Sequence, residues 1–269
     1  MAGLSISKAW DETKGRIAAD GRLFLPVALA FLVLPQTVLG AFSPTTPADL
    51  GGSFFALLII AILGSIIGQI GVARLALPPA LTVGGAIRRA IRRVLPLLAA
   101  FLLACFVAAL IAFACIFVVL VTGLAAPPTS GATPPRWVIF LVVIPMLLTL
   151  ALFQLVFPIA AAEEGGPIKM LTRSWTLGVS SYWRLVAFLA LVWIGMLLIW
   201  LSAQVIAGLA AAAIFGPPER GSVGALLVGL VVAMVQAGWT VITSVMLARI
   251  YVQLSGQGAL DVSVPKSGT

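Results

Sequence analysis

Two adjacent carboxylates, Glu163 and Glu164, open the stretch EEGGPIKMLTRSW, in which the basic residues Lys169 and Arg173 stand one helical turn apart. Carboxylates beside basic side chains can serve as a general acid and a general base. The chain contains no histidine, the side chain that most often performs this chemistry or binds metal near neutral pH. No nucleophile motif and no cluster of metal-ligating residues accompanies the pair. We therefore expect no catalytic residue, no metal and no cofactor.

The role expected for these carboxylates is structural. Pro167 suits the first turn of a helix, where its missing N–H leaves no hydrogen bond unmade. Glu163 and Glu164 precede that turn, close to the positive end of the helix dipole. We expect them to cap and orient the helix, or to pair with a neighbouring arginine.

A shortage of charge indicates which solvent surrounds this chain. Hydrophobic residues make up 62% of its 269 residues and charged residues 9%, and its mean hydropathy is +1.19. A soluble domain carries about 25% charged residues, so we expect this chain to lie in lipid. Cys105 and Cys115 stand in one apolar run, roughly 15 Å apart along a helix, which is too far for a disulfide.

Apolar runs long enough to cross a membrane, which takes about 20 residues, recur along the chain. We predict six spans, over residues 23–42, 54–77, 95–121, 137–162, 185–215 and 223–247, the last of which extends to 247 or a little beyond. The first is too long for the apolar part of a cleaved signal peptide, so we expect the protein to retain it. The predicted fold class is an all-α integral membrane protein with a single transmembrane domain, and residues 256–269 form a flexible tail.

Lysine and arginine are distributed unequally between the predicted loops. Four precede the first span, five lie in the last turn of the second span or before the third, three precede the fifth, and two follow the sixth or lie at its end. The opposite loops hold the remaining two, Arg136 and Arg220. Because basic residues are enriched on the cytoplasmic side of a membrane, we expect both termini in the cytoplasm.

The opening stretch has a counterpart earlier in the chain. TVGGAIRRAIRR, at residues 82–93, aligns without gaps on residues 163–174, with two glycines, an isoleucine and two basic positions in common. A fainter copy, SISKAWDETKGRIAADGRLFLP, precedes the first span. We therefore predict three repeated units, 1–77, 78–162 and 163–255, each an interfacial amphipathic helix followed by a hairpin of two spans.

In these interfacial helices, apolar and basic residues occupy opposite faces. Ile168, Leu171 and Trp175 form the predicted apolar face of the third helix. Such a helix lies in the headgroup layer, where each basic residue gains about 1 kcal/mol beside anionic lipid. The residues that we expect to bind lipid headgroups are Arg88, Arg89, Arg92, Arg93, Lys169, Arg173 and Arg184. The alternative is that these charges only set the topology during insertion.

Polar side chains inside the predicted spans are candidate functional residues. They are Gln36, Gln69, Gln154, Gln204, Gln236 and Thr240. A pore or a substrate path could use them. They could instead form ordinary hydrogen bonds between helices, which contribute about 0.6 kcal/mol each. We favour this second interpretation.

Other residues predict how the spans pack. Gly64 and Gly68 predict a close contact between helices. Arg74 and Arg249 stand at the ends of spans, where we expect them to extend toward the headgroups. Kinks or local unwinding are predicted at Pro26, Pro35 and Pro145.

The stretch LTRSWTLGVSSYWRLVAFLAL, preceded by FPIAAAEEGGPI and with LARIYVQLSG ending the last span, resembles the glycerophosphoryl diester phosphodiesterase membrane-domain family. The residues that carry the resemblance are Pro158, Glu164, Gly165, Leu171 to Arg173, Ser174, Trp175, Trp183 and Arg184. It implies a multi-span module of the bacterial inner membrane. The family is named after members joined to a soluble phosphodiesterase, which uses histidines and metal-binding carboxylates. This chain has no histidine, so the resemblance implies no such activity.

These patterns favour a non-enzymatic membrane protein that organises the membrane or acts as a scaffold for partner proteins. The expected partners are anionic membrane lipids and either another protein or a second copy of the chain, with no nucleic acid. One alternative is a carrier of a small molecule or lipid, with a glutamine-lined site between the repeats. Another is an enzyme acting on lipid headgroups, with Glu163 and Glu164 as acid and base. A polar cavity reaching mid-membrane would favour the carrier, and a packed apolar core would favour the scaffold.

Overall fold

The computed structural model describes residues 5–44, 51–79, 82–121, 140, 144, 153–216, 219 and 221–256. Within these ranges the regular structure is helical and includes no strand, which confirms the predicted all-α class. Five helical runs in the described ranges are long and apolar enough to cross a membrane. The sequence therefore forms a helical bundle suited to a multi-pass membrane protein.

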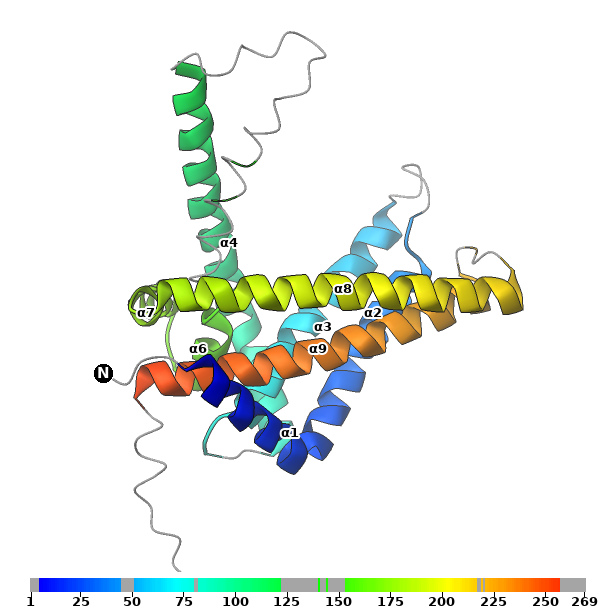
Figure 1. Cartoon of the computed structure of the whole chain (residues 1–269), viewed down its shortest axis with the longest axis horizontal. Helices are drawn as coiled ribbons and strands as arrows, with labels where there is room; N and C mark the ends of the chain where they lie inside the picture. Colours follow the sequence, from blue (N-terminus) through cyan, green and yellow to red (C-terminus); the bar gives the residue numbers. More distant parts are fainter. Residues whose placement is uncertain are drawn as a thin grey trace, which may run out of the picture.

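The long runs are α1 (Ile6–Ala28), which continues through the π-helical segment η1 (Leu29–Val33) into α2 (Leu34–Ala41), then α3 (Gly52–Ala76), α4 (Val83–Val121), α8 (Tyr182–Phe215) and α9 (Val223–Ser255). Two short helices, α6 (Val156–Ala162) and α7 (Pro167–Val179), lie between α4 and α8. The predicted span 137–162 lies mostly outside the described residues, and α6 is its described end. Helices α8 and α9 lie side by side, and α4 extends away from them (Figure 1).

The N-terminal run changes its helical pitch between two prolines. Pro26 lies inside α1, Pro35 lies in the first turn of α2, and η1 separates them. Proline lacks the N–H that would bond to the carbonyl four residues earlier. Between the prolines the helix widens into a π turn, in which the Leu34 N–H donates to the Leu29 oxygen. The predicted local unwinding at Pro26 and Pro35 is confirmed, and Pro145 lies outside the described residues.

Small residues let α3 approach the N-terminal helical run closely. A Cβ atom on Gly68 of α3 would lie 2.6 Å from Leu32 Cδ2, and one on Gly64 would lie 3.0 Å from the Phe31 carbonyl oxygen. In lipid the hydrophobic effect does not drive helices together, because lipid tails are as apolar as the side chains. Close approach at glycine instead supplies the van der Waals contact that holds the helices together. The predicted contact through Gly64 and Gly68 is confirmed.

One end of the bundle has a densely packed core. Side chains from α1, α3, α6, α7 and α9 contribute to it, and each of the following is at most 2% exposed: Phe24, Ile70, Ile159, Met170 and Tyr251. The N-terminal helix is also held there, because the Ser5 N–H donates to Gln253 Oε1 of α9 at 3.2 Å. Helices far apart in the sequence are therefore joined at this end.

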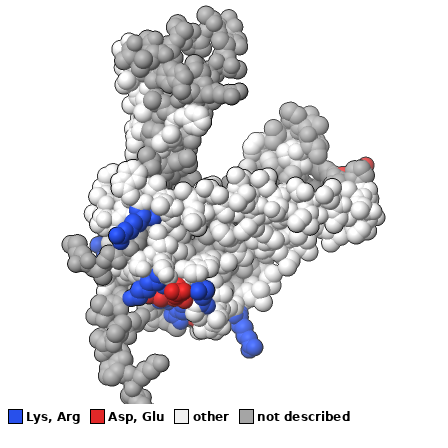
Figure 2. Space-filling view, viewed as in Figure 1, with Lys and Arg blue, Asp and Glu red and all other residues white. Residues whose placement is uncertain are grey.

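Basic side chains gather at the same end of the molecule. In Figure 2, Lys and Arg side chains lie near α7, and a cluster of basic and acidic side chains lies over α1, while the surface along most of α8 is neither basic nor acidic. We call this region the basic end: the first turns of α1 and α4, the short helices α6 and α7, and the last turns of α9. It is the end that the sequence predicts to face the cytoplasm.

The predicted interfacial helices differ from one another. Helix α7 is a separate helix, because the chain turns at Ser180 and Ser181 before α8 begins. The other two basic stretches form the first turns of α1 and α4 and continue into the apolar part of the same helix. Pro96 lies inside α4 without ending it. In lipid a helix satisfies almost every backbone group internally, which favours its continuation past one proline.

Candidate functional site

Glu163 joins three helices at the basic end. Its Oε1 accepts hydrogen bonds from Arg173 Nε of α7 at 3.1 Å and from the Tyr251 hydroxyl of α9 at 2.8 Å. Its own N–H donates to the Ile159 oxygen and closes the last turn of α6. Tyr251 is 0% exposed, and a buried hydroxyl needs a partner, which Glu163 supplies. The predicted pairing of a carboxylate with an arginine is confirmed.

The structure does not show the predicted capping of α7 by the two carboxylates. Gly166 is the N-cap residue, no side chain bonds to the free N–H groups, and Pro167 occupies the first turn. Glu164 has an 84% exposed side chain, and its Oε1 lies 3.9 Å from Arg89 Nη1. Because two glycines separate the carboxylates from Pro167, both acids lie before the position from which a side chain can cap a helix.

Two arginines of α4 bind the backbone of the α6–α7 loop. Arg89 Nη2 donates to the Ala162 oxygen at 3.0 Å, and Arg93 Nη1 donates to the Gly165 oxygen at 2.8 Å. Ala162 is the last residue of α6, where backbone carbonyls lack a partner inside the helix. The predicted second unit therefore contacts the predicted third unit through the stretches that are similar in sequence.

The other two arginines of this stretch face outward. Arg88 and Arg92 are exposed, and each lies one helical turn from the other on α4. A groove of about 520 Å³ opens between the start of α4 and the loop, and it is lined by Gly85, Arg88, Arg89, Arg92, Arg93 and Glu164. All four arginines therefore line the groove, but Arg89 and Arg93 are bound to backbone carbonyls, whereas Arg88 and Arg92 are exposed.

Helix α7 presents two different faces. Met170, Ser174 and Leu177 are buried against the bundle, whereas Ile168 and Trp175 are 69% and 51% exposed. The predicted apolar face of Ile168, Leu171 and Trp175 is therefore divided, because Leu171 is buried with the first group. Among the basic residues predicted to bind headgroups, Lys169 donates to the Glu164 oxygen at 3.2 Å, Arg173 pairs with Glu163, and Arg184 is exposed at the start of α8.

The expectation that Arg74 and Arg249 extend toward the headgroups is wrong. They are 7% and 8% exposed. Arg249 Nη2 donates to the Ala76 oxygen at 2.6 Å, and Arg74 Nη1 donates to the Leu77 and Pro79 oxygens at 3.3 Å each. Both thereby satisfy carbonyls at and just after the C-terminus of α3. The sequence signal was the Pro-Pro pair after residue 77, which ends the helix and leaves carbonyls that basic side chains can bind.

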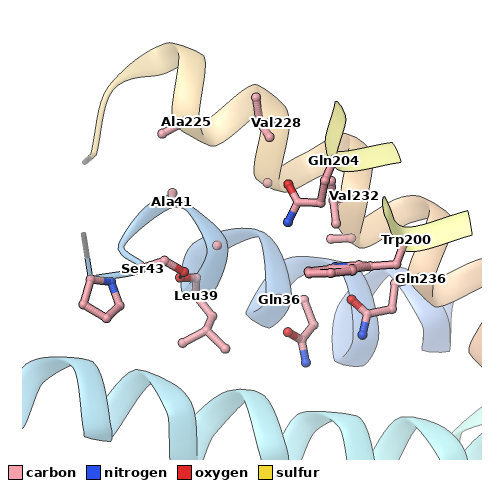
Figure 3. A pocket seen from close by; sticks show the side chains of 14 residues that line it. Gln36, Leu39, Ala41, Ser43, Trp200, Gln204, Ala225, Val228, Val232 and Gln236 are labelled. Carbon is pink, nitrogen blue, oxygen red and sulfur yellow. Dashed lines mark hydrogen bonds between the residues drawn. The ribbon is translucent and has the colours of Figure 1, made fainter. Parts of the chain in front are cut away.

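Three of the predicted intramembrane polar residues line one pocket. Gln36 of α2, Gln204 of α8 and Gln236 of α9 share a cavity of about 380 Å³ with Trp200 and with Ser43, which follows α2. Figure 3 shows these side chains around the space between the three helices. We call this cavity the amide-lined pocket. It lies near the C-terminal end of α2 and the N-terminal half of α9, away from the basic end (Figure 1).

The remaining polar residues are placed differently. Gln69 lines a second pocket of about 420 Å³ between α3 and α4, which Gln36 also reaches and whose other walls are mostly apolar. Gln154 is half-buried before α6 and lines neither of these pockets. The Thr240 hydroxyl donates to the Gln236 backbone oxygen at 2.8 Å, so its own helix satisfies it.

The described part of the chain holds no group of three or more His, Cys, Asp and Glu residues that could bind a metal ion. Residues 4–254 match the model of a family described as a domain of unknown function, DUF7847, and the chain therefore belongs to this family. Comparisons with curated proteins and with solved structures found no significant match. The resemblance to the glycerophosphoryl diester phosphodiesterase membrane-domain family remains a prediction.

Proposed function

We propose that this member of the DUF7847 family is a non-enzymatic protein of the bacterial inner membrane, with six spans in three repeated units and both termini in the cytoplasm. Its basic end contacts anionic lipid headgroups. Through that contact it organises the membrane surface or presents a scaffold to a partner protein.

The groove beside Arg88 and Arg92 carries this proposal. Two exposed guanidinium groups one turn apart can each form paired hydrogen bonds to phosphate oxygens. Arg89 and Arg93 donate to the loop carbonyls behind them, which fixes the helix that presents the exposed pair. At about 1 kcal/mol for each basic residue near an anionic leaflet, the pair contributes about 2 kcal/mol, or roughly 30-fold in affinity.

The outward face of α7 supports a position at the membrane surface. Ile168, Trp175 and Val179 are exposed along one side of this helix, and tryptophan favours the boundary between headgroups and hydrocarbon. A helix with its apolar side in that boundary holds the neighbouring groove at headgroup depth.

The environment of the acidic pair supports a structural role over catalysis. Glu163 already accepts hydrogen bonds from Arg173 of α7 and Tyr251 of α9, and these contacts hold the two helices together. The Glu164 side chain is 84% exposed, whereas the sites that bind small substrates are usually enclosed.

Thermal unfolding of the purified protein in detergent tests the lipid contact. We expect phosphatidylglycerol to raise the unfolding temperature more than phosphatidylcholine does, and the difference to shrink at high salt because screening weakens exposed charges. The Arg88→Gln/Arg92→Gln variant should lose most of this gain, about 4–8 °C for 2 kcal/mol, while unfolding like the wild type without lipid. Inorganic phosphate at the same concentration separates a headgroup contact from free phosphate binding.

The Arg89→Gln/Arg93→Gln variant is the matched control. It removes the same charge, but each side chain loses a hydrogen bond to the loop, worth about 1.5–3 kcal/mol when the donor is charged. We expect a lower unfolding temperature without lipid and a retained gain with phosphatidylglycerol. Equal gains for the wild type and Arg88→Gln/Arg92→Gln would refute the lipid contact.

The proposed topology has its own test. Cysteines are introduced near Ser130 and near Gly85 in a variant without Cys105 and Cys115. An impermeant thiol reagent applied outside the cell should modify the first site and leave the second unmodified. Modification of both from one side would exclude six spans with cytoplasmic termini.

A carrier is the second candidate function. The observation that favours it is the position of Gln36, which lines both the amide-lined pocket and the more apolar pocket beside α3 and α4. The two pockets together reach from Ser43, after α2, to Leu171 in α7 at the basic end. Transport would require the helices between them to separate, and uptake of a labelled solute into proteoliposomes tests it.

A further inference from the structure

We propose that the amide-lined pocket binds a neutral polyhydroxylated solute about the size of a monosaccharide. The pocket lies at the opposite end of α9 from the basic end, so this inference does not depend on the lipid contact. It also concerns binding alone, whether or not the solute crosses the membrane.

Close helix packing brings the three amides together. A Cβ on Gly229 of α9 would lie 2.9 Å from the Thr37 carbonyl oxygen of α2, so these backbones touch beside the pocket. Further along α9, a Cβ on Gly195 of α8 would lie 2.9 Å from the Trp239 side chain. These two contacts fix α2 and α8 against α9, and the pocket is the space left between them.

Two neighbouring side chains of α8 form one wall. Gln204 follows Trp200 by one helical turn, so both project to the same side, and Figure 3 shows them extending into the space beside α2 and α9. Gln36 and Gln236 approach from the other two helices. Polar side chains from three helices therefore line the same pocket as the indole ring.

The hydrogen-bonding capacity of the three side-chain amides is unused by the described part of the protein. Among the described residues, no group is bonded to the side-chain amides of Gln36, Gln204 and Gln236. Each amide offers two donors and an acceptor oxygen. Exposing an unpaired amide to hydrocarbon costs about 4–8 kcal/mol, so lipid tails are poor occupants. A polar ligand with several donors and acceptors can hydrogen-bond to all three amides.

The residues that line the pocket also disfavour a charged ligand, and the pocket volume limits the size of the ligand. No Lys, Arg, Asp or Glu is among the described residues that line the pocket, so these residues offer an ionic ligand no counter-charge for the hydration that it loses. Trp200 supplies a flat apolar surface against which the C–H face of a saturated ring packs. The volume of about 380 Å³ lies at the small end of the roughly 300–1,000 Å³ found for ligand pockets.

Titration of the full chain in detergent with glucose and with myo-inositol tests the inference. We expect at least one of them to raise the unfolding temperature in a saturable way and to change tryptophan emission. Trp200→Phe should abolish that emission change although six other tryptophans remain of the 7 in the chain. Glucose 6-phosphate, which adds charge to the same ring, should bind at least tenfold more weakly.

The Gln204→Leu/Gln236→Leu variant locates the site. It keeps the volume of both side chains and removes their hydrogen bonds, so the dissociation constant should rise by roughly tenfold for each amide. Folding should be preserved because an apolar group replaces an unpaired polar one. Gln69→Leu, in the neighbouring pocket, is the control and should bind like the wild type.

Each remaining outcome overturns the inference. Sugars excluded from a protein surface also stabilise it, but that effect does not saturate and is the same in all variants. A response of this kind alone would mean that the pocket holds no such solute. Equal affinity for glucose 6-phosphate, or unchanged binding in Gln204→Leu/Gln236→Leu, would likewise refute a neutral ligand at this site.

Discussion

A single methyl group at Gly229 tests how closely α2 and α9 approach. A Cβ there would lie 2.9 Å from the Thr37 carbonyl oxygen, whereas ordinary carbon–oxygen contacts are about 3.3–3.6 Å. The helices would have to separate by roughly half an ångström, and such overpacking typically costs about 1–3 kcal/mol. Replacing glycine by alanine in a helix also gains about 1 kcal/mol. The net loss in unfolding free energy for Gly229→Ala is therefore about 0–2 kcal/mol.

Gly238 in the same helix is the matched control. Nothing lies within 4 Å of a Cβ built there, so Gly238→Ala keeps the helix gain without the clash. The two variants should differ by about 1–3 kcal/mol, or roughly 2–12 °C in unfolding temperature followed by tryptophan emission in detergent. If Gly229→Ala unfolds at the same temperature as Gly238→Ala or above it, the backbone contact between α2 and α9 is not as close as the structure describes.

Two further predictions concern the basic end. Tyr251→Phe removes the hydroxyl that donates to Glu163 and should lower the unfolding free energy by about 1.5–3 kcal/mol. Its control, Glu164→Gln at the exposed neighbouring position, should change that free energy by less than about 0.5 kcal/mol. Chemical unfolding in mixed detergent measures both variants, and equal effects would contradict the assigned hydrogen bond. Arg249→Met leaves a carbonyl at the end of α3 without its donor and should cost about 1.5–3 kcal/mol. Arg92→Met, at an exposed position, is its control. A similar loss of unfolding free energy in both variants would show that charge rather than the buried contact stabilises the fold.

The helices could be predicted from the sequence because apolar length and helix formation in lipid are local properties. The last span was predicted to end at residue 247 or a little beyond, and α9 continues two turns further, to Ser255. Hydropathy falls at Arg249 and Gln253, but the helix persists because these turns pack against α1, α3 and α6. A contact with distant elements therefore decided where this helix ends.

The candidate site was only partly predictable for the same reason. Glu163 and Arg173 stand close enough in sequence for a pairing to be expected, and it is found. Tyr251 lies 88 residues from Glu163, and nothing in its neighbourhood marks it as a partner. The helical period places Arg88 with Arg92 and Arg89 with Arg93, but it does not indicate which pair faces the protein.

Composition and local pattern by themselves determined that this chain is helical, that lipid suits most of its surface, and that its basic residues collect in a few stretches. Each follows from properties that a short segment carries with it wherever it lies: apolar length, charge and helical period. Tertiary structure decided which polar groups meet. Arg249 caps a helix that ends 173 residues earlier, and three glutamines from three helices share one pocket. Such encounters depend on how whole helices pack, and packing is set by glycine contacts such as that of Gly229 with Thr37, whose partner no local pattern specifies.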